Sequence, residues 1–254
     1  MKYIVMDLEF NQHFNFGDSA DQPGINPSLP FEVIQTGMVE LDENFNVSST
    51  LSILIKPQIY KRMHPFVEKL TGITKDMFDG EKSFPETYGT LIDFAGGNDN
   101  VFCVWGGTDV KLLHRNIAYY KLDGSKLTKR YIDVQHMATK RMKLPAGACV
   151  GLENAVKSLD IPTGAAFHNA LNDALYTAAI FKALKNEEPT IETCCVEQPA
   201  KGKTRRGAAR LFDVDKMLAE AEKMYGRELT KKEKSVLKRI YAMGRRNKFG
   251  YNKK

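Results

Sequence analysis

The stretch that decides the fold lies at the start of the chain, where residues 2–8 read Lys-Tyr-Ile-Val-Met-Asp-Leu. These residues are rich in β-formers and almost continuously apolar, which is typical of a central strand covered on both faces. Asp7 and Glu9 lie two residues apart at the end of this stretch. Because side chains alternate along a strand, both carboxylates are expected on the same face.

The chain that follows predicts an α/β fold. Residues 11–30 contain several Gly and Pro residues and indicate a long loop, while 31–42 and 46–56 predict an antiparallel hairpin. Helices and buried strands then alternate. The expected helices are 64–71, 74–79, 83–95, 108–120, 135–143, 151–158 and 169–186, and the expected strands are 101–105 and 130–134. Three strands followed by alternating elements indicate a mixed, five-stranded sheet flanked by helices.

The composition is that of an ordinary globular protein. The 254 residues are 43% hydrophobic and 27% charged, which excludes collagenous, disulfide-rich and disordered classes. Apolar stretches fall far short of the roughly 20 residues that cross a bilayer, and no signal-peptide pattern follows Lys2, so we expect a cytoplasmic protein without membrane contact. The four cysteines show no C-x-x-C spacing, which favours free, reduced thiols.

Positive charge is concentrated at the end of the chain. Residues 190–254 carry a balance of +10, whereas residues 1–189 carry −4. This change divides the chain into a main domain (1–188), a basic linker (189–210) and a basic helical hairpin (211–254). The tail residues expected to contact nucleic acid are Lys201, Lys203, Arg205, Arg206, Arg245 and Arg246. A solvated basic hairpin, or one that docks a protein partner, is the alternative.

Acidic residues mark the ends of two expected strands. Asp7 and Glu9 repel each other unless a cation lies between them, and hard oxygen ligands suit Mg²⁺ or Mn²⁺. Solvent-facing acids at a strand end explain the same pair. Asp109 follows the strand 101–105 and begins a helix, where the helix dipole alone favours an acid.

His168 and Asp173 form the most informative pair. Five residues of helix turn by about 140° net, so the two side chains cannot share a helix face. We therefore expect His168 in the loop before the helix, with Asn169 as the N-cap and Asp173 in the first turn. Neutral imidazole is a suitable base for water. A surface loop histidine is the alternative.

Taken together, the four acids and the histidine are what a two-metal phosphodiester hydrolase requires. In this order and spacing, Asp7-Leu-Glu9, Asp109 and His168-x4-Asp173 resemble the motifs of the DEDDh 3′→5′ exonucleases, the DnaQ-like branch of the RNase H-like superfamily. The segments 31–37 and 66–74 support the resemblance, which covers about residues 1–186.

The resemblance implies an RNase H-like fold and a specific reaction. Asp7, Glu9, Asp109 and Asp173 would hold two divalent cations, Mg²⁺ or Mn²⁺, and His168 would be the general base. Nucleoside monophosphates would be released from the 3′ ends of single-stranded RNA or DNA.

The resemblance also implies where the substrate strand passes, and two rivals to the nuclease interpretation stay open. The implied substrate contacts are Phe10, Asn11, Leu70, Thr71, Gly72 and Ile73. The rivals are a non-cutting nucleic-acid-binding scaffold and a polymerase-associated proofreading partner.

Overall fold

The fold is that of a computed structural model, which describes residues 1–14, 24–145 and 147–195, together with 228, 230 and 234. The chain divides into two units, Met1–Pro199 and Ala200–Lys254, and every named helix and strand belongs to the first. Apart from residues 228, 230 and 234, the predicted basic helical hairpin (211–254) lies outside the described residues, and so do the six basic tail residues. They stay predictions.

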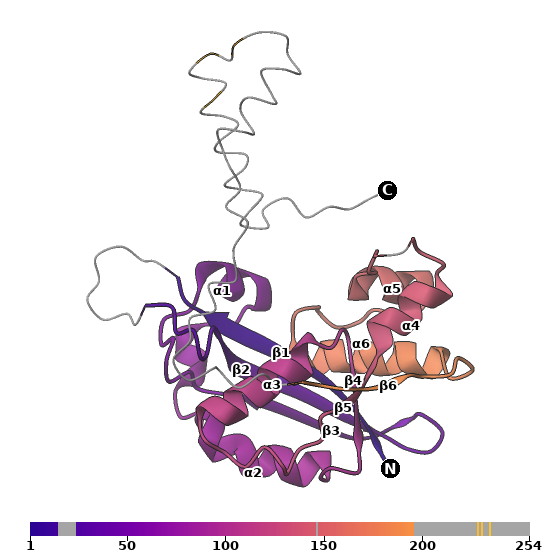
Figure 1. The fold of residues 1–254 in the computed structure, drawn as a ribbon, viewed down its shortest axis with the longest axis horizontal. Coiled ribbons are helices and arrows are strands. Elements are labelled where there is room, and N and C mark those ends of the chain that lie inside the picture. The colour runs from indigo at the N-terminus through magenta and orange to yellow at the C-terminus, as the bar shows by residue number, and fades with distance from the viewer. Residues whose placement is uncertain (15–23, 146, 196–227, 229, 231–233, 235–254) are drawn as a thin grey trace. The chain divides into compact units, whose positions relative to one another are not determined.

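A mixed sheet forms the centre of the first unit (Figure 1). Its strands lie in the order β3-β2-β1-β4-β5-β6. Strand β1 pairs antiparallel with β2 and parallel with β4, so the predicted central position of the first strand is confirmed. The bounds are β1 Tyr3–Gln12, β2 Phe31–Leu41, β3 Val47–Leu54, β4 Val101–Val104, β5 Arg130–Asp133 and β6 Ile191–Thr193.

The sixth strand corrects the five-stranded prediction. Ile191–Thr193 pairs antiparallel with β5, and the Tyr131 hydroxyl donates a 2.7 Å hydrogen bond to Glu192. Three exposed residues are too few to show the two-residue alternation that identifies a strand in sequence. This strand exists because the edge of β5 offers it hydrogen-bonding partners.

Helices cover both faces of the sheet. One core lies between the sheet and α4, α5 and α6, and it contains Val5 and Val39. The other lies between the sheet and α2 and α3, and it contains Ile4 and Met6. The helices are α1 Pro65–Thr71, the 3₁₀ helix η1 Lys75–Phe78, α2 Phe84–Ala95, α3 Thr108–Tyr119, α4 Val134–Arg141, α5 Leu152–Ser158 and α6 Ala170–Ala183. The predicted helices of the main domain are thus confirmed.

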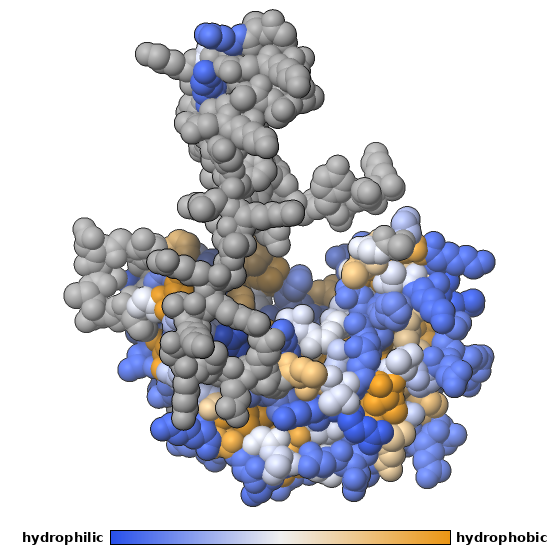
Figure 2. All heavy atoms as spheres, viewed as in Figure 1, coloured by the Kyte–Doolittle hydropathy of each residue, from blue (hydrophilic) through white to orange (hydrophobic). Residues whose placement is uncertain are grey.

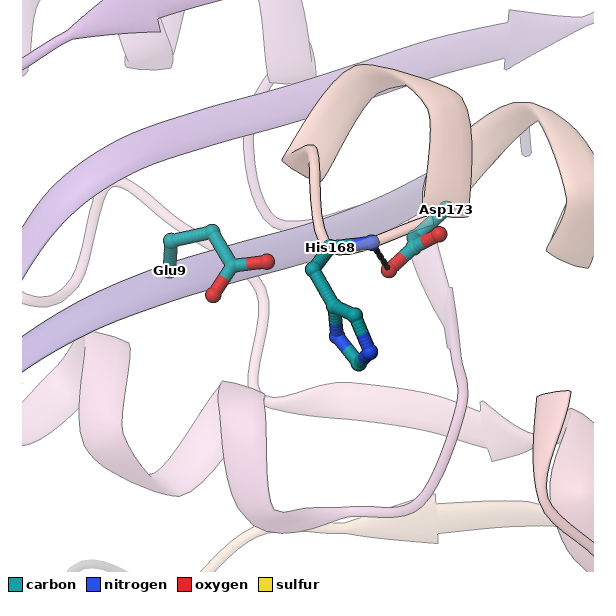
Figure 3. Close-up of side chains that lie close together, drawn as sticks. All are labelled: Glu9, His168 and Asp173. Atoms are coloured by element: carbon teal, nitrogen blue, oxygen red, sulfur yellow. Dashed lines mark hydrogen bonds between the residues drawn. The ribbon is translucent and has the colours of Figure 1, made fainter. Parts of the chain in front are cut away.

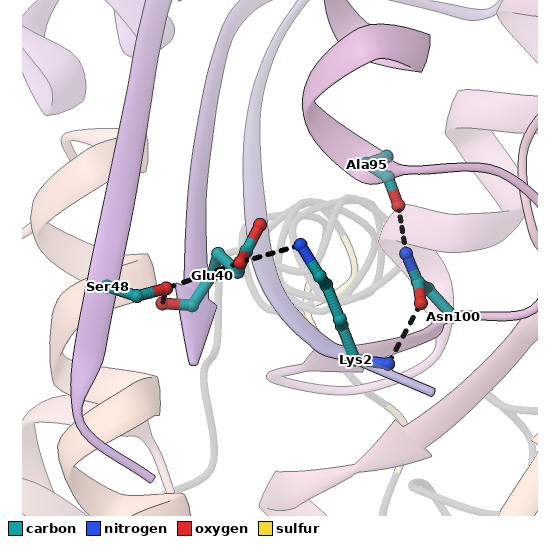
Figure 4. A network of polar contacts seen from close by, with 5 residues as sticks. All are labelled: Lys2, Glu40, Ser48, Ala95 and Asn100. Carbon is teal, nitrogen blue, oxygen red and sulfur yellow. Dashed lines mark hydrogen bonds and ion pairs between the residues drawn. The ribbon is translucent and has the colours of Figure 1, made fainter. Parts of the chain in front are cut away.

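The start of β1 is held by a polar network at the end of the sheet away from Glu9 (Figure 4). The Lys2 amide donates to Asn100 Oδ1 at 2.9 Å, and Asn100 Nδ2 donates to the Ala95 carbonyl at 2.7 Å. Asn100 is buried, so its amide joins β1 to the end of α2 in the protein interior. The Lys2 ammonium also pairs with Glu40 at 2.9 Å.

The face of the first unit visible in Figure 2 is mostly hydrophilic, with hydrophobic residues in separate spots. Isolated apolar residues of this kind are normal on protein surfaces. Among the described residues, no helix is both long and apolar enough to cross a membrane.

Candidate active site

Strand β1 supplies the first two carboxylates. Its parallel pairing with β4 covers only Tyr3–Val5, so β1, still paired with β2, continues past its contact with β4 toward Asp7 and Glu9. Val5 packs in the core beneath α6, and the two-residue period places Asp7 and Glu9 on the same face as Val5. The strand runs on to Gln12, with a bulge between Glu9 and Phe10, so the acids lie within the strand and before its end.

Asp109 reaches the same region from the next strand. After β4 the chain turns through Gly106 and Gly107, and α3 then begins with Asp109 in its first turn. An added Cβ at Gly107 would lie 2.7 Å from the Tyr131 ring, so a larger residue there would displace this ring. The Leu8 amide donates a hydrogen bond to the Asp109 carboxylate, which ties this acid to β1.

Helix α6 supplies Asp173 and places His168 just before its first turn. Asn169 is the N-cap and accepts a 3.3 Å hydrogen bond from the Asn172 amide, as predicted. His168 has a φ of 63°, in the left-handed region that few non-glycine residues adopt. Its amide donates a 3.0 Å hydrogen bond to Asp173 Oδ2, so the turn is held by the acid that it brings into the site.

These elements bring Glu9, His168 and Asp173 together (Figure 3). Each offers one ligand atom, and the three atoms lie within 4.8 Å of one another. The His168 side chain is exposed, whereas Asp173 is buried. Asp173 Oδ2 accepts from His168, but the buried Oδ1 atom has no hydrogen-bond partner. A buried carboxylate oxygen without a donor is costly, and an oxygen of this kind fits the role of a cation ligand.

The acids of the site perturb one another. Burial, followed by the charges of Asp173 and Asp109, raises the pKa of Glu9 to about 7. Burial is also the main cause that raises the pKa of Asp7 well above its usual range, with contributions from all three other acids. Burial likewise raises the pKa of Asp173, although the His168 amide opposes the shift. Such a cluster is unfavourable without a positive charge among its members.

A divalent cation fits this site, because carboxylate oxygens of Glu9 and Asp173 lie close together where negative charge accumulates, beside the His168 imidazole. The four predicted acids lie close together around β1, and the exposed His168 lies beside Glu9 and Asp173. Electrostatic coupling of Asp7 with Glu9, Asp109 and Asp173 supports this proximity.

The two predicted substrate residues on β1 differ in exposure. Phe10 is half-buried and packs edge-to-face on Phe31. Asn11 is fully buried and donates to the carbonyls of Tyr60 and Arg62, while its oxygen accepts from the His64 amide. The Asn11 amide is used to hold the chain at 60–64, and the substrate contact predicted for Asn11 stays a prediction.

The four residues of the predicted segment from Leu70 to Ile73 also differ in exposure. Leu70 and Gly72 are exposed, and Gly72 ends α1 with a φ of 72°. The half-buried Thr71 hydroxyl donates to the Val67 carbonyl and accepts from the Ile73 amide. Ile73 is buried in a small core with Val67, and the substrate contact predicted for Ile73 stays a prediction.

Two residues of β2 that were not predicted as site residues contact the first turn of α6, which carries Asp173. Gln35 Oε1 accepts a 3.0 Å hydrogen bond from the Ala170 amide, and Gly37 lies against the backbone of the first turn of α6. The signal for Gly37 was present in the sequence. A glycine inside a strand of larger residues often marks a place where another backbone approaches closely. Nothing comparable in the sequence indicated the role of Gln35.

Comparisons with known proteins agree with this geometry. The RNase_T family model, described as an exonuclease, matches residues 4–181. The human protein ERI1 exoribonuclease 3 is 23% identical over 192 residues, which cover 72% of this chain and 53% of the relative. This chain thus spans about half the length of the curated relatives that it matches.

Solved structures show the same fold. The nuclease domain of 3′hExo, a DEDDh family member bound to rAMP, superposes with a TM-score of 0.63 at 21% identity, covering 76% of this chain and 97% of that one. The E. coli exonuclease I complex with single-stranded DNA gives a TM-score of 0.57 at 17% identity, covering 74% and 41%.

The family model covers most of the chain, so the protein belongs to the RNase_T exonuclease family. Its first unit is an RNase H-like exonuclease domain, and the predicted resemblance to DEDDh 3′→5′ exonucleases is confirmed. Exonucleases of this family are hydrolases that use divalent metal ions.

Proposed function

We propose that this protein is a 3′→5′ exonuclease that hydrolyses the terminal phosphodiester bond of single-stranded RNA or DNA and releases nucleoside monophosphates. The observation that carries the proposal is the meeting of Glu9, His168 and Asp173, whose ligand atoms lie within 4.8 Å, at a buried carboxylate oxygen without a partner. Family membership agrees with this reaction.

Asp7, Glu9, Asp109 and Asp173 would hold two cations, Mg²⁺ or Mn²⁺. When bound, such ions supply charge stabilisation for the attacking and leaving oxygens. The exposed imidazole of His168 lies beside Glu9 and Asp173 and would accept the proton of the attacking water. Because water is the nucleophile, no side chain forms a covalent intermediate.

We propose that the same reaction acts on both RNA and DNA strands. One structural relative is bound to rAMP and another to single-stranded DNA, so both RNA and DNA are proposed substrates. The exposed Leu70 and Gly72 and the half-buried Phe10 keep their proposed roles at the substrate.

The proposed location of the protein is the cytoplasm. The described cysteines are free, which suits that reducing compartment.

The test uses purified protein and its Asp7→Ala and Glu9→Gln variants. Matched 5′-labelled single strands of RNA and DNA are incubated with Mg²⁺, Mn²⁺ or EDTA. We expect a metal-dependent ladder that shortens from the 3′ end and is lost in both variants. Tight binding of both strands without any cleavage would contradict the proposal and favour the non-cutting scaffold.

The basic tail is proposed to bind nucleic acid beyond the active site, and this rests on the charge balance of +10 over residues 190–254. Replacing Lys201, Lys203, Arg205 and Arg206 by Gln in the full chain tests it. We expect weaker strand binding and a smaller dependence of affinity on salt. Unchanged affinity at every salt concentration would instead favour a protein partner, as in a proofreading assembly.

A further inference from the structure

We propose that Gln35 and Gly37 of β2 are positioning residues for the active site, because together they set the place of the first turn of α6 and therefore of His168 and Asp173. This inference rests on the proposed nuclease function for its catalytic consequence. The positioning itself is a property of the protein without metal or substrate, so it can be measured separately.

The register of the sheet places both residues beside the carboxylates. Gln35 is the cross-strand partner of Glu9, and Gly37 is the partner of Asp7. Directly paired residues of antiparallel strands point to the same face of a sheet. Gln35 and Gly37 therefore lie on the face that carries Asp7 and Glu9, which is the face that α6 covers.

Gly37 allows the backbone of α6 to approach the sheet. A Cβ added at this position would lie 2.2 Å from both the carbonyl carbon and the oxygen of Ala170, and 2.3 Å from the Leu171 nitrogen. These are backbone atoms of the first helical turn, so no side-chain rotation could relieve the overlap. A larger residue at position 37 would push the start of α6 away from β2.

Gln35 supplies the hydrogen bond that fixes this approach. The amides in the first turn of a helix have no partner within the helix. Asn169 satisfies the Asn172 amide, and Gln35 Oε1 accepts from the Ala170 amide at 3.0 Å. Both Gln35 and Ala170 are buried, so water cannot replace this bond without opening the contact.

The consequence for the site follows from the short distance along the chain. Ala170 lies two residues after His168 and three before Asp173. Since the His168 amide is bonded to Asp173, a shift of the first turn moves both side chains together relative to Glu9. A displacement of about 1 Å in a catalytic group can lower a rate about 100-fold.

The experiment compares Gln35→Met, which keeps the size but removes the acceptor, with Gln35→Glu, which keeps an acceptor. The control is Asn100→Leu, which removes a buried amide at the end of the sheet away from Glu9 (Figure 4). Three quantities are measured in the full chain. They are hydrogen exchange of the Ala170 amide without metal, Mn²⁺ affinity by calorimetry, and kcat and KM on a labelled single strand.

For Gln35→Met we expect Ala170 exchange and the Kd for Mn²⁺ each to rise about 10-fold or more. We expect kcat to fall about 10- to 100-fold at nearly constant KM. In Gln35→Glu, the Ala170 amide should exchange as slowly as in the wild type. Asn100→Leu should lower Tm while leaving all three quantities near wild type.

Unchanged exchange and Mn²⁺ affinity in Gln35→Met would overturn the inference, as would equal losses in Asn100→Leu, which would show a general loss of stability. If the wild-type protein cleaves no strand, the proposed function fails. In that case, faster exchange and weaker Mn²⁺ binding confined to Gln35→Met still support the positioning role.

Discussion

The backbone amide of His168 donates a hydrogen bond to the carboxylate of Asp173, five residues later, at 3.0 Å. The bond closes the turn that begins α6 and leaves the other oxygen of Asp173 buried without a partner. One residue therefore shapes the loop with one oxygen and offers the second oxygen to a ligand. This arrangement explains why the His168 backbone is held at a φ of 63°.

Removing the imidazole tests the role of His168. We expect His168→Ala to lower kcat by about 10²- to 10⁴-fold, the range for loss of a general base, while Mn²⁺ binding and Tm change little. Single-turnover cleavage of a labelled strand measures the chemical step. His136→Ala, which removes another exposed histidine, is the control and should cleave at the wild-type rate. Equal rates for the two variants would exclude His168 as the base.

The raised pKa of Glu9 predicts the pH dependence of stability in the metal-free protein. Between its ordinary value of 4.5 and about 7, the folded protein holds a proton that the unfolded chain releases. Folding is therefore most favourable below pH 4.5 for this group, and that stability is lost as the pH rises through 7. The effect is on the order of 1–3 kcal/mol.

Urea unfolding at several pH values in EDTA measures this dependence. Glu9→Gln should flatten the decline between pH 5 and pH 7, whereas Glu81→Gln, at an exposed glutamate, should not. Saturating Mg²⁺ should also reduce the decline, since a bound cation stabilises the ionised acids. A wild-type stability that rises with pH over this range in EDTA would be the opposite of what we expect.

Gly37→Ala should destabilise the protein by about 1–3 kcal/mol, as expected when a core contact is overpacked. The reason is the 2.2 Å approach of an added Cβ to the Ala170 backbone. Gly89→Ala is the control. Gly89 lies in α2 with no atom within 4 Å of an added Cβ, so this change should stabilise the helix by about 0.5–1 kcal/mol. Chemical denaturation of the two variants measures both changes in unfolding free energy, which should have opposite signs.

A buried carboxylate on β2 holds the segment before α1. Glu32 accepts hydrogen bonds from the Gln58, Ile59 and Tyr60 amides and from the Tyr120 hydroxyl. Glu32→Gln keeps the shape but turns one acceptor oxygen into a donor that faces other donors, and should cost about 1–3 kcal/mol in unfolding free energy.

Tyr120→Phe removes only one of these bonds and should cost about 1 kcal/mol. Urea unfolding of both variants measures the two losses in unfolding free energy. A Glu32→Gln protein as stable as wild type would show that solvent already satisfies these amides.

Much of the fold and the site was predictable because it depends on local patterns. The apolar run at 2–8 predicted the central strand, and the Asn169 cap and Asp173 spacing predicted the start of α6. The inward position of the Asn11 side chain was not predictable in this way. Nothing local indicated that the Asn11 amide would turn inward and bond to the chain at 60–64.

The sequence by itself determined the identity and order of the acids and the histidine, the faces of β1 and the alternation of helices and strands, because periodicity and capping act over a few residues. Only the tertiary structure decided that Ile191–Thr193 pairs with β5, that Gly37 meets the backbone of Ala170, and that Gln35 accepts its amide. These contacts join residues more than 50 positions apart, and their energies depend on distances that no local pattern specifies.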